Sequence, residues 1–365
     1  MRRPTVSVLI ATYNSEKYID EAIESVLQQT LRDFELIVVN DGSTDGTREQ
    51  LRKYEEMPRI TIIDQQNSGP AAARNRAFQA STGEFIAILD ADDRNHPARL
   101  EIQSQRLRRD PQLGLVGAFA RKITPSGKPL EILEVPTSYD EIAARIDQSS
   151  QFVHATVMIR RDIFKALGGY REDYPASEDY EFLRRATHDY RAANIPKVLY
   201  DYRIHAESNT FYALEQQKLY GLLTRHLAKT NRAVEQCIDL QANTLSPEIL
   251  VDLGVPRRVI DEALFSSYKR RIRVLVGLGD LEGARKFLEK ARSHHDKSIL
   301  GNEEQATFRV YEIITRPNAF FRTVTRLAGA IRTSPSGTLL ALREWGHFGV
   351  YRIYDRFRRA LNPPR

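Results

Sequence analysis

Two aspartates stand two residues apart after an apolar run of strand length, and this spacing suits metal binding. Asp90 and Asp92 project to the same side if the chain stays extended, whereas Asp93 points away from them. Paired carboxylates repel each other unless a cation compensates, and a Mg²⁺ or Mn²⁺ ion shared with substrate phosphates would do so. The alternative is a cap for the following helix, which suits Asp93 or Asn95 but not all three acids.

A further acid, Asp41, ends another apolar run and opens the glycine-containing segment Asp41–Gly46. Glycine lets the backbone approach a ligand closely, and a carboxylate there can accept hydrogen bonds from a nucleobase or a ribose. Tyr13, which follows the first apolar run, could stack on a base. Ser43 and Asp45 are better explained as a turn that caps the next helix.

Two more chemical groups are expected on helices. Pro70 suits the first position of a helix, and Arg74 lies about one turn inside it, where its guanidinium could hold a diphosphate. Asp179 begins a helix on the same face as Phe182, which turns that face inward. The helix dipole would keep a carboxylate on this first turn ionised, as a general base must be. A capping role is the alternative, and it suits the neighbouring Glu178 better.

His205 and Ser208 follow a later strand-like run and could present an imidazole and a hydroxyl to phosphate or metal. A single histidine is more often structural, and His154 is a weaker candidate still.

Several other chemistries can be excluded. The sequence has no G-x-G-x-x-G after a strand, no G-x-x-x-x-G-K-[ST] phosphate loop and no G-x-S-x-G nucleophile elbow, and its single cysteine excludes a cysteine-based zinc cluster.

Apolar runs alternate with helical spacing over the first ninety residues. Strands are expected at 6–11, 34–40, 60–64 and 84–89, and helices at 18–29, 45–54 and 70–80. This alternation predicts a mostly parallel sheet with helices on both faces, in which ligands bind beyond the carboxyl ends of the strands. Farther along, helices are expected at 96–109, 162–167 and 177–188, and strands at 113–118, 153–159 and 197–203.

Length and composition are those of an ordinary globular protein. The chain has 365 residues and 41.8 kDa, with 41% hydrophobic and 28% charged residues, which excludes wholesale disorder. This length suggests two domains, or one large domain with an appendage. Its one cysteine, Cys237, fits a reducing compartment. No apolar run reaches the roughly 18 to 20 residues of a membrane-spanning helix, and the N-terminus lacks a signal-peptide pattern. A cytoplasmic location is therefore the expectation.

The charge is distributed unevenly. Residues 1–211 carry 28 basic and 32 acidic side chains, a net charge of −4, whereas residues 212–365 carry 26 basic and 16 acidic side chains, a net charge of +10.

The later part of the chain, residues 212–365, has the pattern of helices alone, and 260–276 with 281–292 resembles a helical hairpin. Residues 305–365 combine 11 basic and 3 acidic residues with nine aromatics. Such helices favour peripheral contact with an anionic membrane surface, with packing on the rest of the chain or on a partner as the alternative. No nucleic-acid-binding motif is present.

Five segments, in this order, closely resemble the motifs of the family-2 glycosyltransferases of GT-A fold: Val6–Asn14, Val39–Asp45, Gly69–Asn75, Leu89–Asp93 and Ser177–Asp179. The resemblance implies an α/β catalytic domain of GT-A fold over residues 1–211, followed by a helical, basic accessory region over 212–365. A Gln-x-x-Arg-Trp motif and spanning helices are absent from the sequence, which favours a single-addition transferase over the processive membrane-embedded synthases of that family.

The resemblance also implies a role for each matching residue. Substrate contacts are expected at Ala11, Thr12, Tyr13 and Asp41 (nucleotide base), Arg74 (base or diphosphate), Asp90 (ribose or a metal-bound water), and Gly169 and Tyr170 (acceptor side). Asp92 would be the direct ligand of Mn²⁺ or Mg²⁺, His205 would contact metal or diphosphate, and Asp179 would be the catalytic base.

The activity so implied is inverting and metal-dependent. A single sugar would move from a nucleoside-diphosphate sugar, with a UDP-sugar favoured, to a hydroxyl of a carbohydrate or lipid-linked acceptor, in the assembly of surface polysaccharide or glycolipid. The enzyme would work in the cytoplasm, with peripheral membrane contact through 305–365. The alternative is a non-catalytic sensor or scaffold that binds a nucleotide sugar, and the retention of both Asp92 and Asp179 argues against it.

Overall fold

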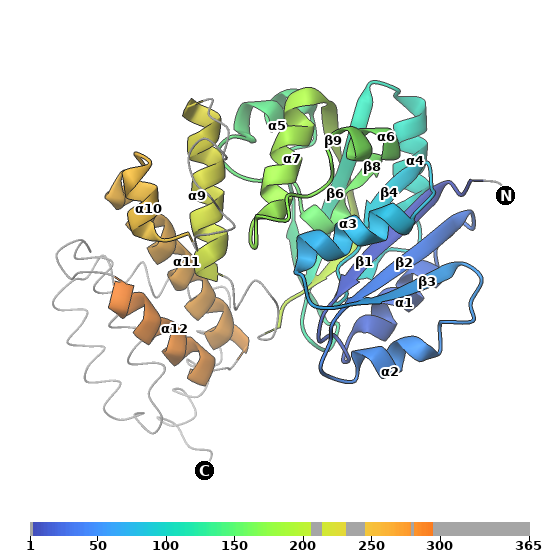
Figure 1. Cartoon of the computed structure of the whole chain (residues 1–365), viewed down its shortest axis with the longest axis horizontal. Helices are drawn as coiled ribbons and strands as arrows, with labels where there is room; N and C mark the ends of the chain where they lie inside the picture. The colour runs from blue at the N-terminus through green and yellow to red at the C-terminus, as the bar shows by residue number, and fades with distance from the viewer. Residues whose placement is uncertain (1–2, 206–213, 231–244, 279–280, 295–365) are drawn as a thin grey trace, which may run out of the picture. The chain divides into compact units, whose positions relative to one another are not determined.

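The computed structural model describes residues 3–205, 214–230, 245–278 and 281–294 of the chain (Figure 1). Ser208 and the basic-aromatic segment 305–365, to which the sequence analysis gave roles, lie outside these residues. None of the helices in the described ranges combines the length and apolarity needed to cross a bilayer.

The described strands form one nine-stranded sheet in the order β3-β2-β1-β4-β8-β6-β9-β5, with β7 paired to β6. Their bounds are β1 Val6–Thr12, β2 Phe34–Asp41, β3 Ile60–Gln65, β4 Phe85–Ile88, β5 Arg94–Asn95, β6 Leu113–Ile123, β7 Pro129–Leu133, β8 Met158–Arg160 and β9 Arg191–Arg203. Strands β1 to β4 pair in parallel, as do β6 and β9, whereas β8 lies antiparallel between β4 and β6. The predicted, mostly parallel sheet is confirmed.

Helices cover both faces of the sheet, as the near-continuous apolar strands predicted. Side chains alternate along each strand, so Val8 and Leu36 belong to one core while Leu9 and Ile37 belong to the other. The first core contains side chains of α1 (Ile19–Leu27), α2 (Thr47–Arg52) and α4 (Arg99–Arg109); the second contains those of α3 (Pro70–Ala80), α5 (Tyr139–Arg145), α6 (Arg161–Ala166) and α7 (Glu178–Asp189). Figure 1 shows α3 lying across its face of the sheet.

Several elements differ from the sequence prediction: β5 was not predicted, β6 and β9 are longer than expected, and three further differences have a clear physical reason. The strand expected at 153–159 is instead a 3₁₀ turn, His154–Thr156, followed by the short strand β8; the Thr156 amide and hydroxyl both bond to the Val153 carbonyl at 2.8 Å, which closes the turn. Strand β7 was missed because its side chains are mostly exposed and leave no hydrophobic alternation. Helix α5 was also missed, although Ser138 and Glu141 form a capping box at its start.

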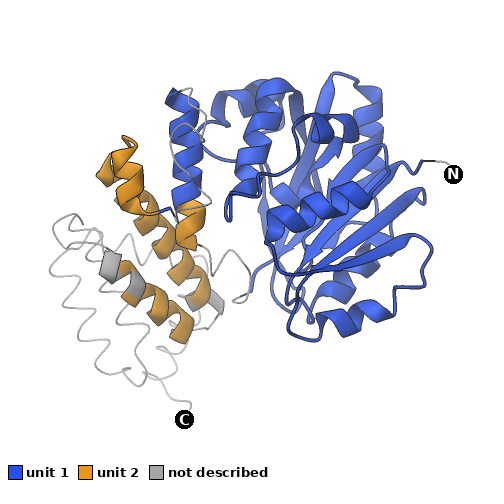
Figure 2. Ribbon diagram, viewed as in Figure 1, with its two compact units in different colours: residues 1–208, 219–245 blue, residues 209–218, 246–365 orange. Residues whose placement is uncertain are grey.

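The chain forms two compact units, residues 1–208 with 219–245, and residues 209–218 with 246–365 (Figure 2). Helix α9 (Leu214–Thr230) is divided between the units, with residues 214–218 in the second and the rest in the first. In the first unit, the ring of Tyr220 from α9 lies 5.3 Å from that of Tyr174. The second unit contains α10 (Pro247–Asp252), α11 (Arg257–Leu278) and α12 (Leu281–His294), and Tyr268 and Phe287 join the last two as the predicted hairpin. A domain boundary at residue 211 stays a prediction.

Candidate active site

Helix α3 brings a buried arginine to the carboxyl edge of the sheet. Gly69, with a φ of 88°, and Pro70 begin the helix, and Arg74 follows one turn later with 11% of its side chain exposed. Its Nη2 donates to Asp90 Oδ1 at 3.1 Å and its Nη1 to Glu178 Oε1 at 2.7 Å. The guanidinium therefore joins the turn after β4 to the start of α7.

The first turn of α7 carries two neighbouring acids. Glu178, for which the sequence favoured a capping role, is instead buried and paired with Arg74, so that interpretation was wrong. Asp179 is half-buried, and burial raises the pKa of its carboxyl to about 7; the charge of Glu178 raises it too, while Arg74 lowers it. Desolvation and a like charge thus outweigh the helix dipole that was expected to keep this acid ionised.

The acidic segment after β4 is a turn. The Asp93 amide donates to the Asp90 carbonyl at 3.2 Å, so the chain does not stay extended here, and the condition under which Asp90 and Asp92 would project to one side is not met. Asp93 itself is buried and accepts from the Arg203 amide at 2.6 Å. Burial and the two neighbouring acids hold its pKa well above the usual range. Helix α4 starts without a side-chain cap, so the capping alternative for these acids does not hold.

Asp92 and His205 form a pair that fits a divalent cation. Asp92 Oδ2 and His205 Nε2 lie 2.8 Å apart, and the side chains are 26% and 9% exposed. A carboxylate oxygen and an imidazole nitrogen are both ligands of Mn²⁺, and the ion would replace the proton that the two atoms share. Within the described ranges, His, Cys, Asp and Glu form no group of three that could hold a metal. Substrate phosphates and water would therefore supply the other ligands, as is usual for Mg²⁺-like ions.

Asp41 ends β2 and is 4% exposed. Its Oδ1 accepts from Gln65 Nε2 at 2.8 Å and from the Ser68 amide at 2.9 Å, and its Oδ2 accepts from the Gly69 amide at 2.9 Å. The carboxylate thus holds the loop that leads into α3. These three hydrogen bonds use three of the four lone-pair positions of the carboxylate. Its contact with a nucleotide base stays a prediction.

The loops after β1 and β2 are joined to each other. The Thr44 amide donates to Asn14 Oδ1 at 2.8 Å, and the Asn14 amide donates to the Ser43 hydroxyl at 3.0 Å. At the end of β1, Thr12 is buried, and Tyr13, next to it, is 41% exposed. Ala11 is half-buried. The exposed ring has room to stack on a base, and the nucleotide contacts of these three residues stay predictions.

The loop before α7 is held by Asn75, a residue that the sequence analysis did not single out. Asn75 Oδ1 accepts from the Tyr170 amide at 2.9 Å, and its Nδ2 donates to the Tyr170 carbonyl at 2.8 Å. Gly169 has a φ of 75°, and a Cβ there would lie 2.5 Å from Asn75 Oδ1. The Tyr170 hydroxyl bonds to His154 Nε2 at 2.8 Å, and burial lowers the pKa of that imidazole to about 3. This loop therefore has a fixed conformation beside Arg74.

Comparison with known proteins identifies the family. The model of "Glycosyl transferase family 2" matches residues 7–168. An uncharacterized glycosyltransferase of Methanocaldococcus jannaschii is 35% identical over 230 residues, which are 61% of this chain and 79% of that protein. The chain belongs to glycosyltransferase family 2.

Two further proteins are similar to this glycosyltransferase, one in sequence and one in fold. The O-antigen biosynthesis glycosyltransferase WbnJ of Escherichia coli is 32% identical over 229 residues, 61% of this chain and 89% of that enzyme. The mannosyltransferase PcManGT of Pyrobaculum calidifontis, solved with GDP-Man and Mn²⁺, matches with a TM-score of 0.50 and 20% identity over 86% of each chain. The predicted GT-A fold and glycosyltransferase class are confirmed.

The structure of the glycosyltransferase adds three residues that the sequence analysis did not assign to the site: Asn75, Glu178 and Arg203. Asn75 directly follows the predicted residue Arg74, and Glu178 directly precedes the predicted residue Asp179. A polar side chain beside a predicted site residue is the only signal that the sequence offered for these two. Arg203 lies two residues before the predicted residue His205, but no role was assigned to it, because a strand arginine is usually exposed.

Proposed function

We propose that this family-2 glycosyltransferase is inverting and metal-dependent, and that it transfers one sugar from a nucleoside-diphosphate sugar to an acceptor hydroxyl. The observation that carries the proposal is the gathering, at one edge of the sheet, of the Asp92–His205 pair with Arg74, Asp90 and Asp179. A base and a site for positive charge at the leaving group are the parts that such a displacement needs.

The base is Asp179. Its ionised carboxylate accepts the proton of the acceptor hydroxyl. The hydroxyl oxygen then forms a bond to the anomeric carbon while the bond from that carbon to the diphosphate oxygen breaks, and the leaving nucleoside diphosphate keeps the electron pair. Because the attack comes from the face opposite the leaving group, one displacement inverts the anomeric configuration.

Positive charge comes from two sources. Asp92 and His205 would hold Mn²⁺ or Mg²⁺, which when bound offsets the charge that develops on the leaving diphosphate. The mannosyltransferase PcManGT, solved with GDP-Man and Mn²⁺, supports this choice of ion. Arg74 has five N–H donors, of which the ion pairs with Asp90 and Glu178 use two. The remaining donors orient the diphosphate.

A donor panel tests the proposal. UDP-, GDP- and dTDP-sugars are incubated with the chain and Mn²⁺, and released nucleotide is measured together with thermal stabilisation. We expect one nucleotide class, UDP by the sequence prediction, to give both signals. If folded protein with Mn²⁺ responded to no donor in either measurement, the result would contradict catalytic transfer and favour the sensor or scaffold alternative.

The rate should depend on pH through Asp179. Because the pKa of its carboxyl is about 7, it is protonated and inactive as a base at lower pH, so turnover should rise with pH and reach half its maximum near pH 7. Glu178→Gln removes the neighbouring negative charge and should move that midpoint to lower pH by about one unit.

The matched control is Glu181→Gln on the same helix. Glu181 is also buried and ion-paired, but with Arg185 at 2.6 Å. The midpoint of that variant should stay at the wild-type value. An unchanged midpoint in Glu178→Gln, or an equal shift in both variants, would show that Glu178 does not control the ionisation of Asp179.

The acceptor is a carbohydrate or a lipid-linked sugar of surface polysaccharide or glycolipid assembly. The relation to an O-antigen biosynthesis enzyme supports this assignment. Peripheral membrane contact through residues 305–365 stays a prediction, and liposome flotation with and without that segment tests it.

A further inference from the structure

Arg203, at the end of β9, is a buried charge that no step of the proposed reaction uses. Its side chain is fully buried, and its Nε donates to the main-chain carbonyl of Asp92 at 2.7 Å. The hydrogen bond crosses 111 positions of the sequence. It fixes the backbone of the turn from which the Asp92 carboxylate reaches His205.

The same guanidinium acts on His205 through an aromatic ring. Tyr18, the residue that precedes α1, has its ring centre 4.6 Å from the Arg203 guanidinium carbon. The Tyr18 ring also lies 4.9 Å from the imidazole of His205, with 52° between the two planes. Arg203 therefore contacts one member of the Asp92–His205 pair directly and the other through Tyr18.

Arg203 is itself anchored at two further points. Its Nη1 donates to the Pro125 carbonyl at 2.8 Å, and its Nη2 donates to Glu21 Oε2 at 2.8 Å. All three guanidinium nitrogens thus have acceptors on different parts of the chain, as a buried arginine needs. A guanidinium held by α1, the β6–β7 connection and the Asp92 turn cannot shift without moving all three.

We propose that Arg203 and Tyr18 are positioning residues that set the affinity of the Asp92–His205 pair for its divalent cation. The inference rests on the proposed metal dependence and adds the residues that orient the ligands. Partners of metal ligands fix the ligand geometry before the ion arrives, and their loss typically lowers metal affinity by about 10- to 100-fold.

Titration of Mn²⁺, in the presence of UDP or GDP and followed by the EPR signal of the free ion, tests the inference. Arg203→Lys keeps the charge but loses the fork of donors, and the Kd for Mn²⁺ should rise by about 10- to 100-fold. Tyr18→Leu removes the ring and should also raise the Kd for Mn²⁺, but by a smaller factor than Arg203→Lys. Tyr18→Phe keeps the ring and should bind as the wild type does.

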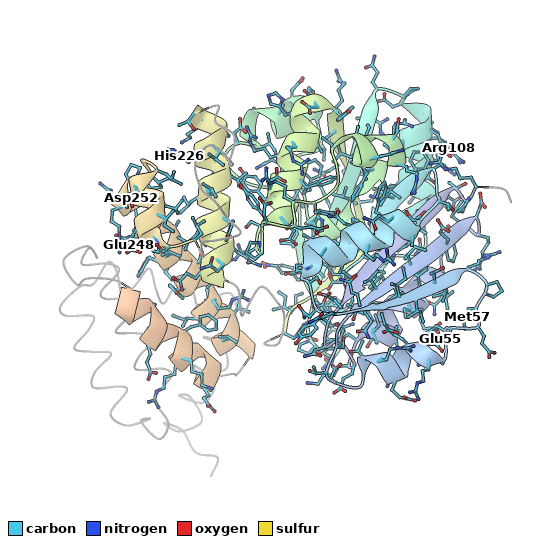
Figure 3. The ribbon with its side chains drawn as sticks, viewed as in Figure 1. Glu55, Met57, Arg108, His226, Glu248 and Asp252 are labelled. Atoms are coloured by element: carbon cyan, nitrogen blue, oxygen red, sulfur yellow. The ribbon has the colours of Figure 1, made fainter. Side chains whose placement is uncertain are left out.

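Arg160→Lys is the matched control. Arg160 also donates to main-chain carbonyls, of Leu107 and Leu113, and lies over an aromatic ring, that of Phe85. Arg160 lies at the opposite end of β4 from the site. Arg108, which is labelled in Figure 3, packs over the same Phe85 ring. The Arg160→Lys variant should have the wild-type Kd for Mn²⁺, although its melting temperature should fall.

The outcomes separate the inference from the function on which it rests. A wild-type chain that binds no Mn²⁺ overturns the proposed metal dependence. A wild-type chain that binds Mn²⁺, with equal Kd in Arg203→Lys and Tyr18→Leu, overturns only the positioning role. Loss of affinity in Tyr18→Phe overturns the role given to the ring, because it would assign the effect of Tyr18 to its hydroxyl. If Arg203→Lys does not fold, Tyr18→Leu decides, because Tyr18 is only half-buried.

Discussion

Asp179→Asn should lower turnover by about 10² to 10⁴ while donor binding stays close to that of the wild type, because the amide cannot accept the acceptor proton but fills the same volume. Turnover is measured with the donor found in the panel, and donor affinity by calorimetry. Near-normal turnover would remove Asp179 from the role of base. Asp189→Asn, the same change at the exposed end of α7, serves as the control and should leave both quantities unchanged.

Stability separates this loss of activity from misfolding. The folded chain holds the Asp179 proton up to about pH 7, whereas an unfolded aspartate releases it near 3.8. The stability due to that proton is therefore present at low pH and is lost as the pH rises through about 7. Asparagine does not titrate, so at pH 8 the variant should melt at a higher temperature than the wild type, and the difference should shrink toward pH 4. A lower melting temperature at pH 8 would contradict the burial of charge at Asp179.

Asp92→Asn should abolish Mn²⁺-dependent donor binding. The amide removes the charged ligand from the pair with His205. The loss of donor affinity should be larger than the loss expected when a residue that only positions the ligands, such as Arg203, is changed, which is about 10- to 100-fold. Calorimetric titration of the donor at several Mn²⁺ concentrations measures it. In contrast to Asp179→Asn, this variant should lose donor affinity as well as turnover.

The control for Asp92→Asn is Asp64→Asn. Asp64 lies on β3, where it accepts from Asn40 and pairs with Arg48, so it has comparable partners that do not include His205. Its variant should keep the wild-type dependence on Mn²⁺. Unchanged Mn²⁺ dependence in Asp92→Asn would instead exclude Asp92 as a metal ligand, and the proposed site formed by Asp92 and His205 would be wrong.

The alternation of strands and helices, and the edge of the sheet at which the candidate site lies, could be predicted from the sequence. Both follow from local periodicity: β1 is apolar at successive positions because both of its faces are covered, and Pro70 begins α3 at the residue expected from its fixed φ. Strand β7 and the turn at His154–Thr156 were missed, because one is exposed and the other is closed by a hydrogen bond that no hydrophobic pattern reveals.

Which charged side chains meet could not be predicted from the sequence and follows from the way the chain folds. Arg74 and Glu178 are 104 positions apart, and Asp92 and His205 are 113 apart; periodicity reports which face of an element is buried but not which other element covers it. The order of strands around β8 brings these pairs together. Asp179 shows the consequence, because its residue type and first-turn position suggested an ionised base, whereas desolvation and the neighbouring Glu178 raise its pKa to about 7. Its position on the helix follows from local sequence, but its ionisation depends on the surrounding charges and solvent, which the whole fold arranges.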